Sequence, residues 1–253
     1  MLKSDMTGKT VIITASAKQP GRAIAKAFAL NGAKLALCDA DNNAVTEFAK
    51  ELSDMGYTAK GYELDILKPE TFKGICEEIK KDLGSIDVLI NNEKDDLTGE
   101  DRKPTHLMDM DRYMTAVRKE LYGTYYMGKT AMAYMDKGVV VNITSSLGLA
   151  PAANCMANVA SSGAIMSLSR VSALEMTPHN IRVHCIARGS LDGYDYENAP
   201  TKEAIDHLAT KRSITPEDVT NAAIFCAGDE AEYLNGEILT VDGGQHIGYM
   251  RNF

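Results

Sequence analysis

The sequence of 253 residues lacks the features that mark membrane, secreted and nucleic-acid-binding proteins. No stretch approaches the roughly 20 apolar residues of a transmembrane helix, and the first residues lack the apolar core of a signal peptide. Lysine and arginine form no block interleaved with aromatic residues, and 27 basic residues stand against 35 acidic ones, which gives a formal charge of -8. We therefore expect a cytoplasmic protein that binds neither membranes nor nucleic acid.

The five cysteines form no Cys-x-x-Cys pair, and the five histidines show no ligand spacing with one another or with the cysteines. The sequence thus offers no metal-binding pattern, and we expect no metal site. The cysteines are widely spaced in apolar or helical surroundings, which favours reduced, buried thiols. They are Cys38, Cys76, Cys155, Cys185 and Cys226.

No internal repeat or linker interrupts an alternation of short β-branched runs with longer helical patterns. This alternation is typical of βαβ units in a parallel, doubly wound sheet with helices on both faces, and the length suits a single domain over residues 1–253. The predicted strands are Thr10 to Thr14, Lys34 to Cys38, Thr58 to Leu64, Asp87 to Ile90, Gly138 to Thr144, Ile181 to Ile186 and Ile238 to Val241. Helices are predicted to start near Pro20, Asn42, Pro69, Asp109, Ala153 and Pro216.

Polar residues follow several of the predicted strands. Ligands of a doubly wound sheet bind beyond the carboxyl ends of its strands, so Asp39, Asn91 and Ser145 are placed where a ligand would lie. The polar stretch from Ser190 to Pro200, within a region of about 188–212, fits a substrate-covering loop and equally a flexible surface loop.

Seven landmarks in this order resemble the short-chain dehydrogenase/reductase family over more than nine tenths of the chain. They are Thr14 to Gly21, Asp39, Asp65, Asn91-Asn92, Ser145 with Gly148, Ile181 to Val183, and Val241 to Gly244. The resemblance implies a Rossmann-type domain of about seven strands, whose enzymes move hydride between NAD(P) and an alcohol or carbonyl. Function must still be read from the site residues, because fold alone does not give it.

The dinucleotide turn of the family reads T-G-x-x-x-G-x-G, and this chain has Ala15 and Gln19 at the first two glycine positions. Glycine lets the backbone turn tightly and approach the pyrophosphate. The Gln19 side chain is expected to enter that approach, whereas a methyl group at Ala15 fits if its φ is not positive. Gly21 remains, and helix packing suffices to explain it.

The family's Asn-Asn-Ala-Gly becomes Asn91-Asn92-Glu93-Lys94, which reduces the room for a cofactor. The resemblance implies that Asp39 would bond the ribose hydroxyls of NAD and that Asp65 would lie near the adenine, but a strand-end turn or an N-cap explains either aspartate equally well. We expect no tightly bound cofactor, and NAD if any. The vestigial positions are Thr14, Gln19, Gly21, Asp39, Asp65 and Asn91.

The catalytic positions of the family can be counted from Ser145, three residues before Gly148. The tyrosine and lysine positions are then occupied by Asn158 and Ser162, and the family's asparagine becomes Glu120. Tyrosine near a lysine ammonium serves as a proton donor with a tuned pKa, and asparagine serves in neither role. Ser145 is left as a remnant, for which capping of the next turn is an equal explanation.

Arg188-Gly189 replaces the family's Pro-Gly after the sixth strand and puts a cation near the nicotinamide position. Arg188 would bind an acidic ligand or simply form a salt bridge. Neither interpretation restores the missing proton donor.

Three functions remain open, so whether the chain is an enzyme by itself is undecided. The first is a non-catalytic subunit that supports or regulates an intact homologous partner in a hetero-oligomeric NAD-dependent dehydrogenase, similar to the inactive half of a heteromeric hydroxyacyl-CoA dehydrogenase. The second is an active oxidoreductase with a relocated proton donor, and the third is a ligand sensor without turnover. Candidate donors for the second are Tyr122, Tyr125, Tyr126, Tyr194, Tyr196, Glu120 and Lys129.

Family members commonly assemble through two long central helices and the C-terminal region, and this chain has corresponding helices at about 109–135 and 153–176. On the first, an apolar stripe would face a partner, although burial in the core explains most of such a stripe. Its members are Tyr113, Val117, Leu121, Tyr125 and Met132.

Overall fold

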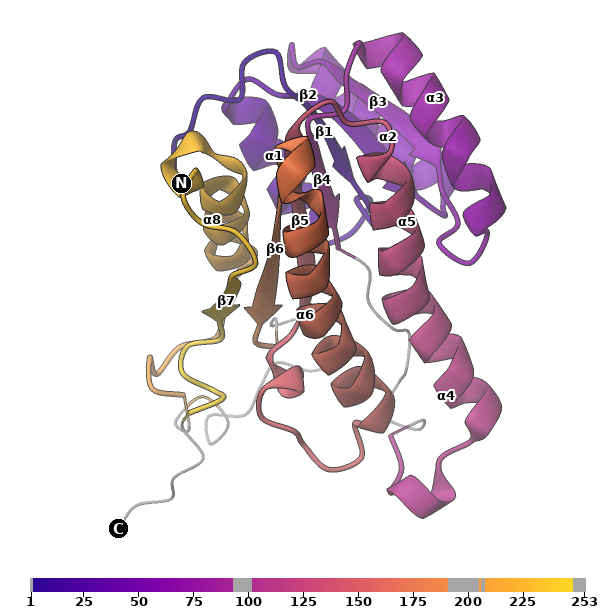
Figure 1. The fold of residues 1–253 in the computed structure, drawn as a ribbon, viewed down its shortest axis with the longest axis vertical. Coiled ribbons are helices and arrows are strands. Elements are labelled where there is room, and N and C mark those ends of the chain that lie inside the picture. The colour runs from indigo at the N-terminus through magenta and orange to yellow at the C-terminus, as the bar shows by residue number, and fades with distance from the viewer. Residues whose placement is uncertain (1, 93–101, 191–204, 206–207, 248–253) are drawn as a thin grey trace.

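A computed structural model describes residues 2–92, 102–190, 205 and 208–247. Its seven strands form one fully parallel sheet in the order β3-β2-β1-β4-β5-β6-β7, as Figure 1 shows. The predicted single α/β domain of Rossmann type is therefore confirmed. The strands are β1 Thr10–Ile13, β2 Lys34–Asp39, β3 Ala59–Glu63, β4 Val88–Asn91, β5 Gly138–Ser145, β6 Ile181–Arg188 and β7 Ile238–Val241.

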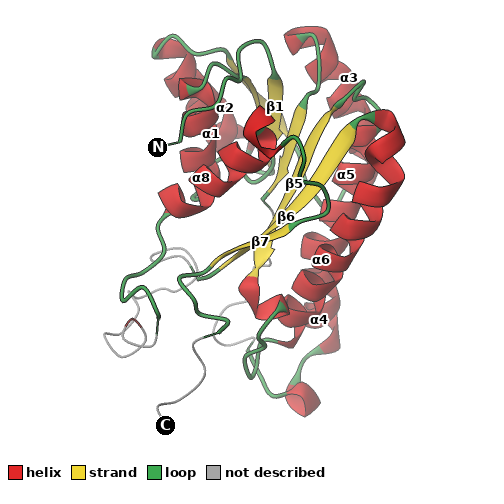
Figure 2. Cartoon of the chain, turned by 60° about the vertical axis from the view of Figure 1, so that its left-hand side comes forward, coloured by secondary structure: helices red, strands yellow, loops and turns green. Residues whose placement is uncertain are grey.

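Helices cover both faces of the sheet (Figure 2). Side chains alternate between the faces along each strand, so Val11 and Ile13 of β1 pack under α1, α2 and α8, whereas Ile12 packs under α3, α5 and α6. Both layers are apolar, which explains why the strands read as nearly continuous hydrophobic runs. The helices are α1 Gly21–Leu30, α2 Asn42–Asp54, α3 Phe72–Leu83, α4 Met110–Val117, α5 Gly123–Met132, α6 Met156–Met176 and α8 Pro216–Ala227.

The helix predicted from Asp109 to Met135 differs from the prediction in its middle. A π-helical turn, Arg118–Tyr122, separates α4 from α5, and α5 ends at Met132. A π turn holds one extra residue, so the stripe of apolar residues is offset across it. Accordingly Val117 is buried, Tyr113 and Leu121 pack beside it, and Tyr125 is 46% exposed.

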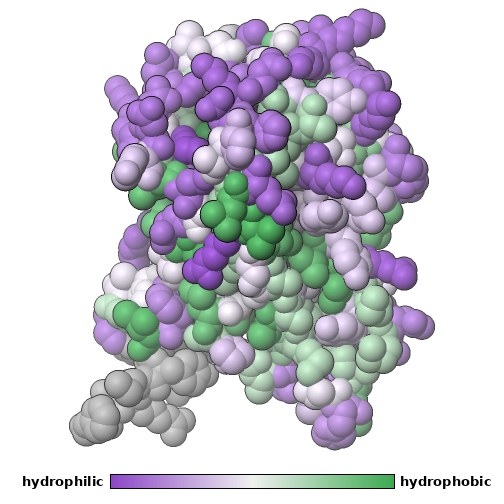
Figure 3. Space-filling model, viewed as in Figure 1, coloured by the Kyte–Doolittle hydropathy of each residue, from purple (hydrophilic) through white to green (hydrophobic). Residues whose placement is uncertain are grey.

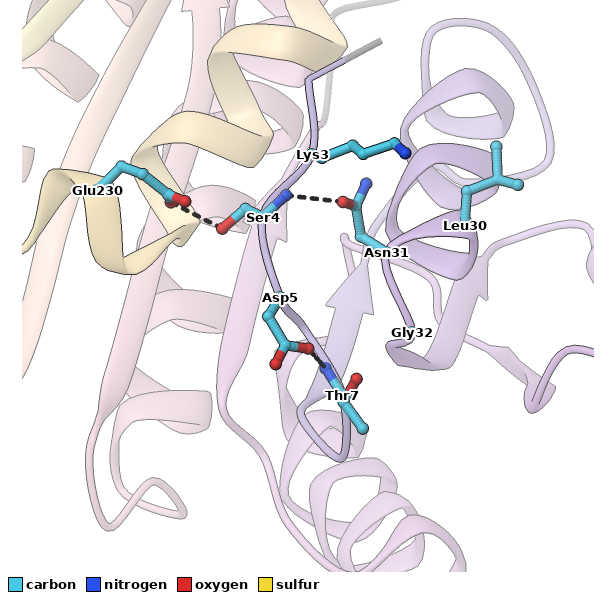
Figure 4. A pocket seen from close by; sticks show the side chains of 8 residues that line it. All are labelled: Lys3, Ser4, Asp5, Thr7, Leu30, Asn31, Gly32 and Glu230. Atoms are coloured by element: carbon cyan, nitrogen blue, oxygen red, sulfur yellow. Dashed lines mark hydrogen bonds between the residues drawn. The ribbon is translucent and has the colours of Figure 1, made fainter.

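The amino-terminal residues run along the amino ends of the strands, far from the strand ends where ligands of this fold bind. There they close a shallow pocket of about 470 Å³ (Figure 4), in which the Ser4 amide donates to Asn31 Oδ1 at 2.8 Å and the Ser4 hydroxyl to Glu230 at 2.7 Å. These bonds fasten the first residues to α1 and to the turn after α8. The pocket is lined by Lys3, Ser4, Asp5, Thr7, Leu30, Asn31, Gly32 and Glu230.

Four of the five thiols are buried as expected, but Cys155 is half-exposed at the start of α6. Burial raises the pKa of Cys76 and of Cys185 to about 12. Among the residues that the structure describes, no helix is long and apolar enough to span a membrane, and no group of three or more potential metal ligands comes together.

Candidate functional site

The residues singled out in the sequence gather at the carboxyl edge of the sheet. The strand register pairs Ser145 of β5 with Arg188 of β6, and Arg188 with Val241 of β7. The turn after β1 lies at the same edge, since Thr14 N donates to Ile90 O at the end of β4 at 3.1 Å. This is the edge where ligands of doubly wound sheets bind.

Ala15 adopts a left-handed backbone with φ of +45°. The condition under which a methyl group would fit here is therefore not met, and a left-handed conformation costs a non-glycine residue about 1–2 kcal/mol. The turn keeps this shape because its neighbours bind it on both sides. Ser16 N donates to Cys38 O at 3.1 Å, and Thr14 Oγ1 accepts from Asn92 N at 3.0 Å.

Asp39 is bonded within the protein. One carboxylate oxygen accepts from Ala17 N at 2.9 Å, and the other from Asp41 N at 3.2 Å. The N-cap of α2 is Asp41 and not Asp39. Asp39 thus holds the turn after β1 from the end of the neighbouring strand. This is the structural role that the sequence offered as the alternative to ribose binding.

Asp65 also serves a turn. It accepts from Leu67 N at 3.0 Å and pairs with Lys68 at 3.1 Å. Burial opposes the ionisation of this carboxyl, but the Leu67 amide and the Lys68 ammonium outweigh it and lower its pKa.

Gln19 is exposed, and its Oε1 accepts from Ala23 N in the first turn of α1 at 3.3 Å. The side chain therefore occupies one of the amides that a helix start offers to a phosphate. Gly21 packs against the turn, since a Cβ there would lie 2.4 Å from Ala15 O. Asn91 is fully buried and donates to Asn142 at 2.8 Å, while Glu93 and Lys94 lie outside the described residues.

Glu120 lies in the π-helical turn and is only 2% exposed. Its Oε1 accepts from Ser162 Oγ of α6 at 3.3 Å and from Thr144 Oγ1 of β5 at 3.2 Å. Ser162 is itself fully buried. Glu120 and Ser162 thus meet in space, and a carboxylate bonded to a hydroxyl stands where the resemblance implied asparagine and lysine.

Ser145 caps the turn that follows it. Its Oγ accepts from Leu147 N at 3.2 Å, at the start of the 3₁₀ turn Ser146–Gly148. A Cβ on Gly148 would lie 2.7 Å from Gly163 N, so this turn is seated against α6 beside Ser162. Asn158 lies about one helical turn before Ser162 on α6 and is partly buried.

This geometry agrees with comparisons to known proteins. Residues 15–246 match the family model described as Enoyl-(Acyl carrier protein) reductase. The chain belongs to the short-chain dehydrogenase/reductase family. Within this family it is 29% identical to a 7alpha-hydroxysteroid dehydrogenase of Clostridium sardiniense, covering 96% of this chain and 95% of the relative.

Two further relatives are similar in length and fold. A sorbitol dehydrogenase of Cereibacter sphaeroides is 30% identical, over 94% of this chain and 98% of the relative. The solved structure of a 7 alpha-hydroxysteroid dehydrogenase complexed with NADH and 7-oxo glycochenodeoxycholic acid superposes with a TM-score of 0.87 at 28% identity, over 95% of each chain. The named relatives are thus family oxidoreductases that match this chain from end to end.

In this chain, three exposed tyrosines lie on the outer side of the π turn and α5. Tyr122, Tyr125 and Tyr126 are 45%, 46% and 41% exposed, and the rings of the last two are 5.5 Å apart. Lys129 is also exposed. These side chains face solvent, whereas Glu120 faces the buried junction of β5 and α6, and Tyr194 and Tyr196 lie outside the described residues.

Arg188 is 8% exposed, and its Nη1 donates to Gly189 O at 3.0 Å. Sequence reasoning missed the group beside it: Asp242, at the end of β7, accepts from His246 Nδ1 at 2.8 Å. The available signal was the pair Gly243-Gly244 between Asp242 and His246, because glycines permit the left-handed turn that brings residue 246 back to residue 242.

Proposed function

We propose that this chain is a non-catalytic member of the family that supports or regulates an intact homologous subunit of an NAD-dependent dehydrogenase. The observation that carries the proposal is the buried contact of Glu120 with Ser162 and Thr144. It fills the place where a family enzyme would keep its proton-transfer machinery.

The chemistry at this place favours structure over turnover. Reduction of a carbonyl needs a proton donor, and the amide of Asn158 does not titrate. Ser162 carries no charge with which to lower the pKa of a neighbouring donor or to hold a ribose. Loss of general acid catalysis costs about 10² to 10⁴ in rate.

The residues at the turn after β1 do not fit a dinucleotide well. Ala15 adds a methyl group where close approach is needed, Gln19 takes the Ala23 amide, and Asp39 takes the Ala17 amide. A cofactor would have to displace these bonds, each worth about 1 kcal/mol net. We therefore propose that NAD binds weakly or not at all to this chain.

The proposed partner is a homologous intact subunit. Apolar side chains are exposed on the outer surface of α6, where Leu174 is 78% and Val171 53% exposed, and Tyr125 lies on α5. Figure 3 shows hydrophobic residues gathered over these helices on the side that faces the viewer. Exposed apolar side chains that gather on one surface mark sites of protein association, which supports contact with a homologous subunit through α5 and α6.

The first test is calorimetric titration of the lone protein with NADH, followed by oxidation assays with a 7α-hydroxysteroid and with sorbitol. We expect no saturable NADH binding in the micromolar range and no turnover. Co-expression with an intact family member is expected to yield a complex of fixed stoichiometry. Micromolar NADH binding with turnover by the lone chain would overturn the proposal.

A restored variant sharpens this test. It carries Ala15→Gly, Gln19→Gly, Glu120→Asn, Asn158→Tyr and Ser162→Lys together. If this variant binds NADH, the five substituted positions account for the lack of NADH binding in the wild-type chain. If it also gains turnover, adding Ser145→Ala should abolish that turnover. In the parent itself, Ser145→Ala is expected to change the melting temperature slightly and the activity not at all.

A further inference from the structure

The turn at the end of β7 holds a histidine in a fixed orientation. Asp242 is 4% exposed and accepts three hydrogen bonds: from Gly244 N at 2.9 Å, from His246 N at 2.8 Å and from His246 Nδ1 at 2.8 Å. Two of these bonds shape the turn and the third fixes the imidazole ring. The His246 side chain is 29% exposed.

These contacts define the tautomer of the neutral ring. An ionised carboxylate only accepts hydrogen bonds, so the proton of neutral His246 resides on Nδ1. Nε2 then carries a lone pair and acts as an acceptor. No other residue in the described part of the chain bonds to Nε2.

The pair lies on the ligand-binding edge of the sheet. Gly189 N donates to Val241 O at 2.9 Å, and a Cβ on Gly189 would lie 3.0 Å from Asp242 Cα, so the turn sits directly on the end of β6. The register places Ser145, Arg188 and Val241 on adjacent strands. With strands about 4.8 Å apart, the turn begins roughly 10 Å from the end of β5.

We propose that His246, oriented by Asp242, is a specificity-determining residue of a ligand site at this edge and recognises the hydroxyl group of an alcohol. A lone pair on Nε2 accepts a hydrogen bond from a ligand O–H. A ketone of the same shape offers only another acceptor, so it leaves Nε2 without a bond. The inference stands beside the proposed function, because such a contact requires neither cofactor nor turnover.

The experiment uses the full chain labelled with ¹⁵N-histidine and titrates it with cyclohexanol and, separately, cyclohexanone at a pH where His246 is neutral. NMR of the ring nitrogens is expected to show a protonated Nδ1, and cyclohexanol is expected to shift the Nε2 signal. Its affinity should exceed that of cyclohexanone about fivefold, the equivalent of one net hydrogen bond. The His179 signal, on a separate exposed turn, serves as the internal control.

Two variants test whether Nε2 of His246 recognises the hydroxyl group or is merely exposed to the probe. Asp242→Asn replaces the carboxylate that fixes the ring proton on Nδ1 by a neutral amide, and is expected to reduce the preference for cyclohexanol. His246→Phe should abolish the preference. Asp65→Asn is the matched control, since Asp65 also holds a turn at a strand end but contacts no histidine.

Melting curves of each variant establish that it is folded before titration. If neither probe shifts Nε2 in the folded wild type, or both do so equally and Asp242→Asn leaves the ratio unchanged, the proposal is wrong. The failure would not touch the proposed function, which is decided by NADH binding and turnover.

Discussion

Two turns at the carboxyl edge of the sheet, after β1 and after β7, are built on the same plan with different residues. Each is held by an aspartate that accepts backbone amides, Asp39 for the first and Asp242 for the second. Each requires left-handed backbone, at Ala15 in the first and at Gly243 and Gly244 in the second. The turn after β7 has glycine at both left-handed positions. The turn after β1 has the same left-handed backbone but carries alanine where the family has glycine.

The two turns differ in where their stabilising aspartate lies, and the turn after β1 is held by a neighbouring strand. Asp39 lies on a neighbouring strand, 22 positions along the chain from the amide of Ala17, whereas Asp242 is within four residues of everything it holds. The first turn therefore depends on tertiary contacts and the second on local ones. Five substitutions test this beside three controls, each measured as the free energy of unfolding in urea.

The largest effect is expected from Gly21→Ala. Its Cβ would lie 2.4 Å from Ala15 O and 2.8 Å from Ser16 Cα, which are backbone atoms that cannot move aside cheaply. Overpacking of this kind costs about 3 kcal/mol. Gly74→Ala, in open space within α3, is the control and should stabilise by up to about 1 kcal/mol. Equal effects at the two sites would mean that the turn after β1 is loosely packed.

Asp242→Asn should cost about 2 kcal/mol and Asp39→Asn about 1 kcal/mol, since hydrogen bonds to a charged group are worth more when that group is buried. Asp242 is buried and makes three bonds, whereas Asp39 is half-buried and makes two. The reverse order would show that the turn after β1 is the more tightly held of the two.

Gly244→Ala is expected to cost about 1–2 kcal/mol for its left-handed backbone. A Cβ there would also lie 2.8 Å from the Cβ of Ala209. Gly8→Ala is the matched control: its φ is +80° against +82° for Gly244, but nothing lies within 4 Å. The difference in destabilisation between the two variants measures the cost of the contact with Ala209. Equal destabilisation would show that Ala209 moves aside without cost.

The smallest effect, and the only gain among substitutions in the two turns, is expected from Ala15→Gly. Relief of the left-handed conformation is partly offset by the greater entropy of glycine in the unfolded chain, which leaves about 0.5–1 kcal/mol of stabilisation. Ala17→Gly, two residues on and without positive φ, should destabilise instead. A loss of stability at residue 15 would contradict the strain assigned to it.

The fold was predictable from the alternation of strand and helix patterns, because both faces of a parallel sheet must be apolar. The seven strands lie within two residues of their predicted ends. The π turn was not predictable, since the apolar pattern of a helix does not show where one extra residue is accommodated. It matters here because it carries Glu120 into the junction of β5 and α6.

The site was predictable only as a set of positions. Counting from Ser145 identified Asn158 and Ser162, the Leu-x-Gly that follows it identified Glu120, and the structure shows that Glu120 bonds to Ser162. The bond of Asp39 to the Ala17 amide in the turn after β1 could not be foreseen, because the direction of that amide depends on the left-handed residue at position 15. The bond of His246 to Asp242 depends on the left-handed turn at Gly243 and Gly244, which two glycines permit but do not require.

The order of the strands has a consequence for synthesis of the chain. β1 is made first but lies inside the sheet, between β2 and β4, and its Thr10 amide bonds to Asp87, 77 positions away, at 2.7 Å. A nascent chain can pair β1 with β2 early, yet the other edge of β1 stays open until β4 has left the ribosome. An open apolar edge is a template for pairing with other chains, so we expect the first half of this protein to be prone to aggregation until β4 is made.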